Sequence, residues 1–225
     1  MGPAIGDILP VAIGVAISPV PIIAMVLILG SQRARANGLC FLAGWLIGLF
    51  GLGVAVILIV GGAATDSDNA PAIWVGWLLL ILGLLAMALG IRQWRGRPGP
   101  GVEPPTPKWM AAIDEFTSVR SLVFGFVFAA VNPKNTTLTL AAGASIAAAG
   151  LATGDSFIVL AVFVVIGTLG LAIPLIIYFA MGSRATQVLS DLQHWMAVNN
   201  AAIMSVLFVV IGAKLVGSGI GVVTG

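Results

Sequence analysis

Two short segments combine prolines with polar side chains inside long apolar runs of the chain. In the first, SPVP, Pro19 and Pro21 follow Ser18; in the second, NPKN, Lys134 follows the pair Asn132–Pro133. A proline inside a helix has no N–H and clashes with the carbonyl four residues earlier, so each segment predicts a break in its helix. A serine or asparagine followed by proline is typical of a new helix start, with the polar residue as its N-cap.

The chemistry expected at these breaks is the binding of an anion or of a polar head group. A helix start carries a positive partial charge and free N–H groups, both of which attract anions. Lys134 adds a full positive charge, and no acidic residue lies at a comparable depth in any apolar run to neutralise it. The predicted binding residues are Ser18, Pro19, Pro21, Asn132, Pro133, Lys134, Asn135 and Thr136.

A structural explanation of the same residues stays open. The three prolines release the carbonyls of Val15, Ile17 and Ala129, and inside a membrane such carbonyls need a partner from the protein or from water in a cavity. In this explanation the prolines are packing kinks, and Lys134 donates to the carbonyls freed by Pro133.

The elements that carry both segments are predicted to be membrane-spanning helices. Of the 225 residues 60% are hydrophobic and only 8% are charged, whereas about 25% are charged in a soluble domain. Several apolar runs reach the roughly 20 residues that cross a bilayer. The fold class is therefore an all-α polytopic membrane protein, with six spans expected at about 8–30, 37–61, 72–92, 120–150, 155–182 and 198–220.

Basic residues predict the orientation of these spans. Lys and Arg gather in or beside the connections 31–36, 93–119 and 183–199, and none occurs in 62–71 or 151–154. Since cytoplasmic loops are enriched in Lys and Arg, both termini are expected outside the inner (plasma) membrane. The Pro/Gly-rich connection 93–119 is expected to be a cytoplasmic linker that ends in an interfacial helix, and 185–197 resembles a second interfacial helix.

The linker divides the chain into two halves of three spans, 1–92 and 120–225. Because three is odd, the second half runs opposite to the first, and any internal repeat must be inverted. Pro19 and Pro133 each lie in the first span of their half, and GLGVAVILI (51–59) resembles GLAIPLIIY (170–178). The expected layout is two inverted three-helix repeats whose first and fourth helices, broken by prolines, meet near the middle of the membrane.

Other kinds of chemistry lack the residues they need. One cysteine, Cys40, and one histidine, His194, provide neither a disulfide nor a cluster for a metal ion. The chain has no Walker A sequence, no nucleophile elbow and no paired carboxylates, so neither an enzyme nor a cofactor is expected. The arginines form no basic stripe, so no nucleic-acid partner is expected. A homodimer through glycine-rich helix faces stays an open alternative.

The two segments and their surroundings resemble a family of actinobacterial membrane proteins. The stretch ISPVPIIAMVLILGSQRARANGLCFLAGWLIG (17–48), the Pro-rich loop and the stretch NPKNTTLTLAAG (132–143) are similar to the Sap/GAP family. Its members are called sulfolipid-addressing and glycopeptidolipid- or peptidoglycolipid-addressing proteins, and the family is placed in the lysine-exporter superfamily.

This resemblance implies a fold and a function, and two other functions stay open beside it. It implies six spans in two inverted repeats, with proline motifs at Ser18–Pro21 and Asn132–Asn135. It also implies movement of a cell-envelope glycolipid across the inner membrane, often beside a larger lipid transporter. The chain lacks the paired cysteines of redox members of the superfamily and the intramembrane acids expected of a cation exporter. The alternatives are a glycolipid transporter or its accessory, an exporter of a small anion or amino acid, and a scaffold that recruits a larger transporter.

Overall fold

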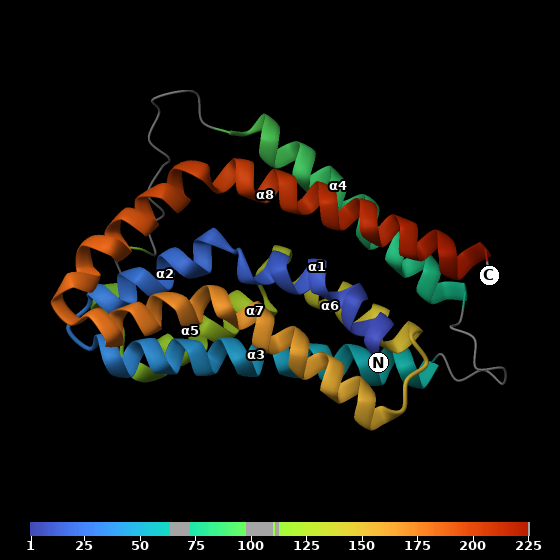
Figure 1. The fold of residues 1–225 in the computed structure, drawn as a ribbon, viewed down its shortest axis with the longest axis horizontal. Coiled ribbons are helices and arrows are strands. Elements are labelled where there is room, and N and C mark those ends of the chain that lie inside the picture. Colours follow the sequence, from blue (N-terminus) through green and yellow to red (C-terminus); the bar gives the residue numbers. More distant parts are fainter. Residues whose placement is uncertain (64–72, 98–109, 111–112, 225) are drawn as a thin grey trace.

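The computed structural model describes residues 1–63, 73–97, 110 and 113–224, which fold into helices without a β-strand (Figure 1). The α-helices are α1 (Gly2–Ala16), α2 (Pro19–Gly30), α3 (Ala34–Ala63), α4 (Ile73–Arg95), α5 (Ser118–Ala130), α6 (Pro133–Ala148), α7 (Thr153–Met181) and α8 (Ala185–Thr224). Two short 3₁₀ helices, η2 (Ile113–Glu115) and η3 (Gly182–Arg184), precede α5 and α8.

The lengths of these helices confirm a membrane-embedded, all-helical chain. Four of them, α3, α4, α7 and α8, are long and apolar enough to cross a membrane. The pair α1 and α2 counts as a fifth span, bent by 49°. Because α5 has only 13 residues, it is a shorter apolar helix, and the six-span inverted layout stays a prediction.

Both predicted helix breaks occur at the proline segments. The first break, Ile17–Ser18, separates α1 from α2, and Ser18 has an extended backbone at the N-cap position. The second break, Val131–Asn132, separates α5 from α6, and Asn132 has the corresponding conformation. The expected span 120–150 is therefore two helices.

The C-terminal region differs from the prediction. An interfacial helix at 185–197 and a separate span at 198–220 were expected, but α8 is one continuous helix of 40 residues. The connecting sequence MAVNNAAIM contains neither proline nor glycine, and Asn199 donates its amide to the carbonyl of Trp195 within the helix (2.9 Å). Figure 1 shows how α8 curves instead of stopping.

The linker is described only in part. Its Pro/Gly-rich stretch lies outside the described residues, and the interfacial helix expected after it is represented by η2 alone. Ile113 of η2 is buried in the core, and Phe116 packs edge-on against Phe124 of α5, with ring centroids 5.0 Å apart.

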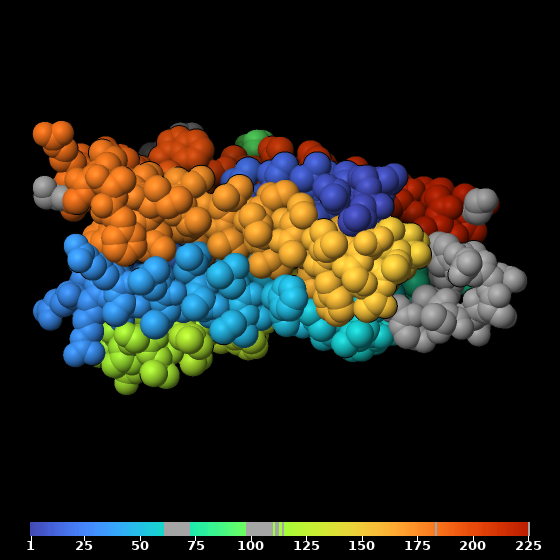
Figure 2. Space-filling model, turned by 60° about the horizontal axis from the view of Figure 1, so that its bottom comes forward, coloured from blue at the N-terminus to red at the C-terminus, as the bar shows by residue number. Residues whose placement is uncertain are grey.

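The helices form two layers. α4 and α8 lie side by side as a pair, and the main layer contains α1, α2, α3, α5, α6 and α7 (Figure 1). Within the main layer α1 contacts α7, while α3 contacts α5, α6 and α7. Figure 2 shows one face of this layer, where α7 (orange to yellow) lies between α3 (blue to cyan) and α1 (dark blue).

A seam of glycines spaced by seven residues holds the α4–α8 pair together. Gly76, Gly83 and Gly90 of α4 face Gly219, Gly212 and Ser205 of α8 in antiparallel order. A Cβ atom added to Gly83 would lie 2.9 Å from the carbonyl oxygen of Gly212. Since lipid offers no hydrophobic drive for helix association, close backbone packing at small residues is a main source of stability.

The same principle sets the crossing of α3 and α5. A Cβ atom on Gly44 of α3 would collide with the carbonyl of Leu122, and one on Gly125 of α5 would collide with the carbonyl of Phe41. Gly48 of α3 approaches Ala129 in the last turn of α5. This crossing fixes the end of α5, and with it the position of the second break.

The seam predicts a difference between two glycines of α8. In Gly212→Ala, the new Cβ would lie 2.7 Å from the carbonyl oxygen of Gly83, so the helices must separate. We expect the melting temperature of the purified protein to fall by roughly 3–8 °C, as for an overpacked core. Gly217 has no atom within 4 Å of its Cβ position, so Gly217→Ala is the matched control. Equal melting temperatures for the two variants would contradict the seam.

Candidate functional site

The two helix breaks lie against each other, although Ser18 and Asn135 are 117 positions apart in the sequence. The Nζ of Lys134 donates a hydrogen bond to the Oγ of Ser18 (2.7 Å) and a longer one to the carbonyl of Ile17 (3.5 Å). The Oγ of Ser18 also lies 3.1 Å from Oδ1 of Asn135. Lys134 is half-buried, while Ser18 and Asn135 are buried. These contacts join α2 to the first turn of α6.

The side chain of Ser18 forms a hydrogen bond at the end of α1 and none at the start of α2. Its Oγ lies 2.7 Å from the carbonyl oxygen of Val15, which Pro19 deprives of its helical partner. Its side chain makes no capping bond, so the predicted capping by its side chain is wrong. The physical reason is that the Oγ of Ser18 lies against the carbonyl of Val15 and accepts from the Nζ of Lys134, while Pro21 at the third position of α2 has no N–H to donate.

The second break is satisfied mainly by its own residues. Asn132 caps α6 as predicted, because its Oδ1 accepts from the backbone N–H of Lys134 (3.1 Å). Asn135 donates its side-chain amide to the carbonyl of Phe128 (2.9 Å). The hydroxyl of Thr136 lies 2.8 Å from the carbonyl oxygen of Ala130. The side chains of Asn135 and Thr136 therefore complete the end of α5.

The contacts of Lys134 differ from those that the structural explanation expects. If its role were structural, it was expected to donate to the carbonyls freed by Pro133. The hydrogen-bond partners of its side chain lie instead at the first break, where Ile17 has the carbonyl released by Pro21. The ammonium group thus connects the two breaks.

Each helix start leaves one backbone N–H for a ligand, fewer than the sequence suggested. In α2, Pro19 and Pro21 have no N–H, and the N–H of Ile22 is bonded to the carbonyl of Ser18. This leaves the backbone N–H of Val20. In α6, Pro133 has no N–H and the N–H of Lys134 is bonded to the side chain of Asn132. This leaves the backbone N–H of Asn135. Lys134 is therefore the main positive group at the junction.

A pocket of about 250 Å³ opens at this junction, between the main layer and the α4–α8 pair. Six of the eight predicted residues line it: Ser18, Pro19, Pro21, Asn132, Lys134 and Asn135. The other two, Pro133 and Thr136, do not line it. Thr136 uses its hydroxyl on backbone carbonyls instead.

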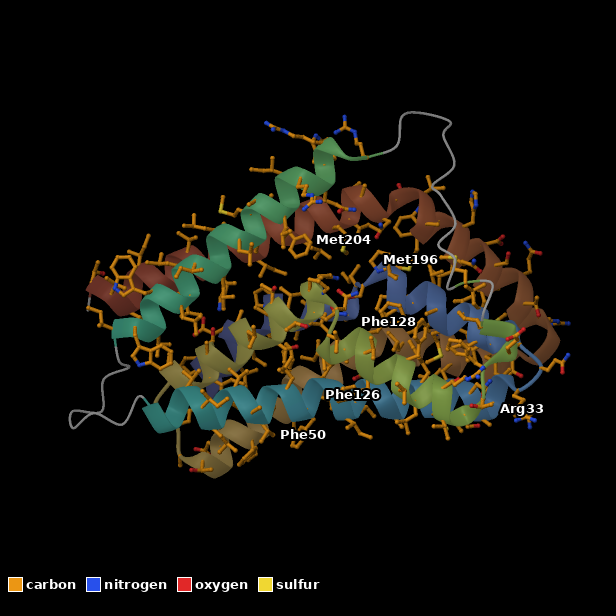
Figure 3. All side chains as sticks on the ribbon, turned by 180° about the vertical axis from the view of Figure 1, so that it is seen from behind. Arg33, Phe50, Phe126, Phe128, Met196 and Met204 are labelled. Carbon is orange, nitrogen blue, oxygen red and sulfur yellow. The ribbon has the colours of Figure 1, made fainter. Side chains whose placement is uncertain are left out.

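The sequence did not identify the wall of the pocket that α4 and α8 supply. This wall contains Gln93, Asn200, Met204 and Phe208. A polar pair, Asn199–Asn200, and a glutamine at the end of an apolar run were visible as signals, but nothing in the sequence paired them with the breaks. Figure 3 shows Met204 on the side of α8 that faces the main layer.

The charges around the pocket are unbalanced. Among the described residues, the ion pair found is between Lys214 of α8 and Asp7 of α1 (3.2 Å), and Lys214 also donates to the backbone carbonyl of Asp7. Lys134 has no carboxylate partner in the described parts of the chain. No group of three or more His, Cys, Asp or Glu side chains that fits a metal ion occurs there either.

The junction predicts that Asn135 is needed for stability. Asn135→Ala removes the hydrogen bond to the carbonyl of Phe128 and the contact with Ser18 at a buried position. We expect a melting temperature lower by roughly 3–10 °C, from about 1–3 kcal/mol of lost interaction. Asn199→Ala, which removes an exposed bond within α8, should change it by less than about 2 °C. An unchanged melting temperature in Asn135→Ala would show that the junction contributes little.

Comparison with known proteins gives one family. A family model described as Sap, sulfolipid-1-addressing protein, matches residues 8–221, which include both breaks and every residue that lines the pocket. The comparison with curated proteins gives no match, and neither does the comparison with solved structures. The placement in the lysine-exporter superfamily stays a prediction. Because the match covers nearly the whole chain, this protein belongs to the sulfolipid-1-addressing protein family.

Proposed function

We propose that this protein moves a cell-envelope glycolipid with an anionic head group across the inner membrane, alone or as the accessory of a larger lipid transporter. The observation that carries the proposal is the pocket in which Lys134, without a carboxylate partner among the residues that the structure describes, joins the two helix breaks. The family name supports it, because a sulfolipid bears sulfur in its head group, where a sulfate or sulfonate is anionic.

The argument for an anion rests on the hydrogen bonds of Lys134. An ammonium group has three hydrogens. One is donated to Ser18 and a second reaches Ile17 only at 3.5 Å, so at least one is left for a ligand. An ionised lysine in a membrane costs about 2.5–3.5 kcal/mol on insertion scales, and a bound anion would offset that cost. The N–H groups of Val20 and Asn135 add two further donors.

The argument for a lipid rests on the shape and lining of the pocket. At about 250 Å³ it holds a head group but not a whole lipid. Polar side chains line it on both sides, whereas the large apolar side chains of Met204 and Phe208 come from α8. In this proposal the head group meets Lys134, and the acyl chains leave between the two layers toward the bilayer.

Helix contacts support the inverted repeat as part of this proposal. A twofold relation between 1–92 and 120–225 exchanges α1–α2 with α5–α6, α3 with α7, and α4 with α8. It would then map the contact of α1 with α7 onto that of α5 with α3, and the contact of α2 with α8 onto that of α6 with α4. All four contacts occur, as does the contact between α4 and α8 that the relation maps onto itself.

The proposal predicts the behaviour of a strain that lacks the gene. Surface lipids and whole-cell lipids would be extracted separately and compared by mass spectrometry. We expect a glycolipid that is made normally but is depleted at the surface, because only its movement fails. The wild-type gene should restore it, and Lys134→Ala should leave at least a tenfold deficit, since the anion loses its main partner.

Lys214→Ala is the matched control, because it removes the other lysine of an apolar helix, one that already has Asp7 as its partner. Immunoblots would establish equal amounts of each variant. Unchanged surface lipids in the deletion strain would refute lipid transport and turn attention to a small anion or amino acid. Full rescue by Lys134→Ala, with loss of rescue after deletion of the 93–119 linker, would favour a scaffold.

A further inference from the structure

The α8 wall of the pocket contains a polar atom whose hydrogen-bonding capacity is unused. Asn200 lines the pocket, and its side-chain Oδ1 is buried without a hydrogen-bond partner among the described residues. Its neighbour Asn199 differs, because its amide bonds to the carbonyl of Trp195 in the same helix. Buried polar atoms in proteins are almost always partnered, so an unpartnered one beside a pocket points to a missing partner.

Asn200 is distinct in its position. The other buried side-chain atoms without a partner among the described residues belong to Trp45, Ser121, Thr139 and Ser145. None of these residues lines the pocket that contains Lys134. A ligand in that pocket can therefore be the partner of Asn200, but not of the other four residues.

The two sides of the pocket offer opposite hydrogen-bonding groups. The ammonium of Lys134 on α6 can only donate, and it suits an anionic oxygen. The Oδ1 of Asn200 on α8 can only accept, and it needs a hydroxyl or N–H group. A plain sulfate or phosphate ester has no hydrogen to offer when fully ionised, whereas a sugar that carries such a group has several hydroxyls.

We infer that Asn200 is a specificity-determining residue that accepts a hydrogen bond from a hydroxyl of the head group, so that the pocket prefers an anionic sugar to a plain anion. The inference rests on the proposed function, because it requires an anionic head group beside Lys134. A site built to bond a hydroxyl discriminates against an analogue without it, since the buried acceptor then stays unpaired. Gln93, which lines the same pocket from α4, lies on the same side of it as Asn200 in the two-layer arrangement.

Two synthetic amphiphiles with the same chain and the same charge test this inference. They are hexadecyl sulfate and a hexadecyl glucoside that carries one sulfate. Equilibrium binding of each to the full-length protein would be measured in nanodiscs of phosphatidylcholine. We expect the wild type to bind the sulfated glucoside about tenfold more tightly, as one additional hydrogen bond provides. Asn200→Leu should reduce this preference to within about twofold and leave the binding of hexadecyl sulfate almost unchanged.

Three further variants make the result decisive. Asn199→Leu makes the same substitution one residue away and should keep the preference. Asn200→Asp keeps an acceptor and adds a negative charge, so both amphiphiles should bind more weakly while the preference remains. If Asn200→Leu does not fold, a folded Asn200→Asp without the preference overturns the inference. Lys134→Gln should weaken the binding of both amphiphiles.

The outcomes separate this inference from the proposed function. If Asn200→Leu keeps the tenfold preference while Lys134→Gln weakens the binding of both amphiphiles, the inference about Asn200 is wrong and the anion-binding site stands. If the wild type binds neither amphiphile, or if Lys134→Gln changes neither affinity, the anionic site fails and the inference fails with it.

Discussion

Backbone carbonyls released by proline inside a membrane must find new hydrogen-bond donors, and the structure of this protein depends on how it supplies them. Water is absent from the hydrocarbon core, so the donors come from side chains or from a cavity. Ser18 serves the carbonyl of Val15, Thr136 serves that of Ala130, which the end of α5 and not a proline leaves free, and Lys134 reaches that of Ile17. The third of these contacts crosses from one half of the chain to the other, and it therefore ties the two breaks into one junction.

The glycine crossings make this junction possible. Lys134 can reach Ser18 only if α1–α2 and α5–α6 are held at a fixed distance, and polar contacts alone would not hold them. Gly44 and Gly125 let α3 and α5 touch backbone to backbone, which fixes the end of α5. On the other side Gly170 of α7 packs against the carbonyl of Ala16, in the last turn of α1. Each broken helix is thus fixed by a neighbour just before its break.

The two-layer arrangement explains why the junction is a pocket and not a closed core. The α4–α8 pair is held together by its own glycine seam and makes narrower contact with the main layer. Polar groups of the breaks therefore face a second wall, in which Met204 and Phe208 lie close to Gln93 and Asn200. A cationic group, buried acceptors and an apolar wall in one space match the chemistry of an amphiphile with an anionic head.

The sequence by itself determined the fold class, the positions of both breaks and most of the pocket's polar residues. These follow from local rules: a proline removes an N–H wherever it stands, and a run of apolar residues forms a helix in lipid. Only the tertiary structure decided that Ser18 turns to α1 instead of capping α2, since its Oγ lies against the carbonyl of Val15 and accepts from Lys134 of the other half of the chain. It also decided that Lys134 bonds to the opposite break. The α4–α8 wall could not be predicted, because the pairing of distant helices depends on which small residues meet, and apolar helices carry many equivalent faces.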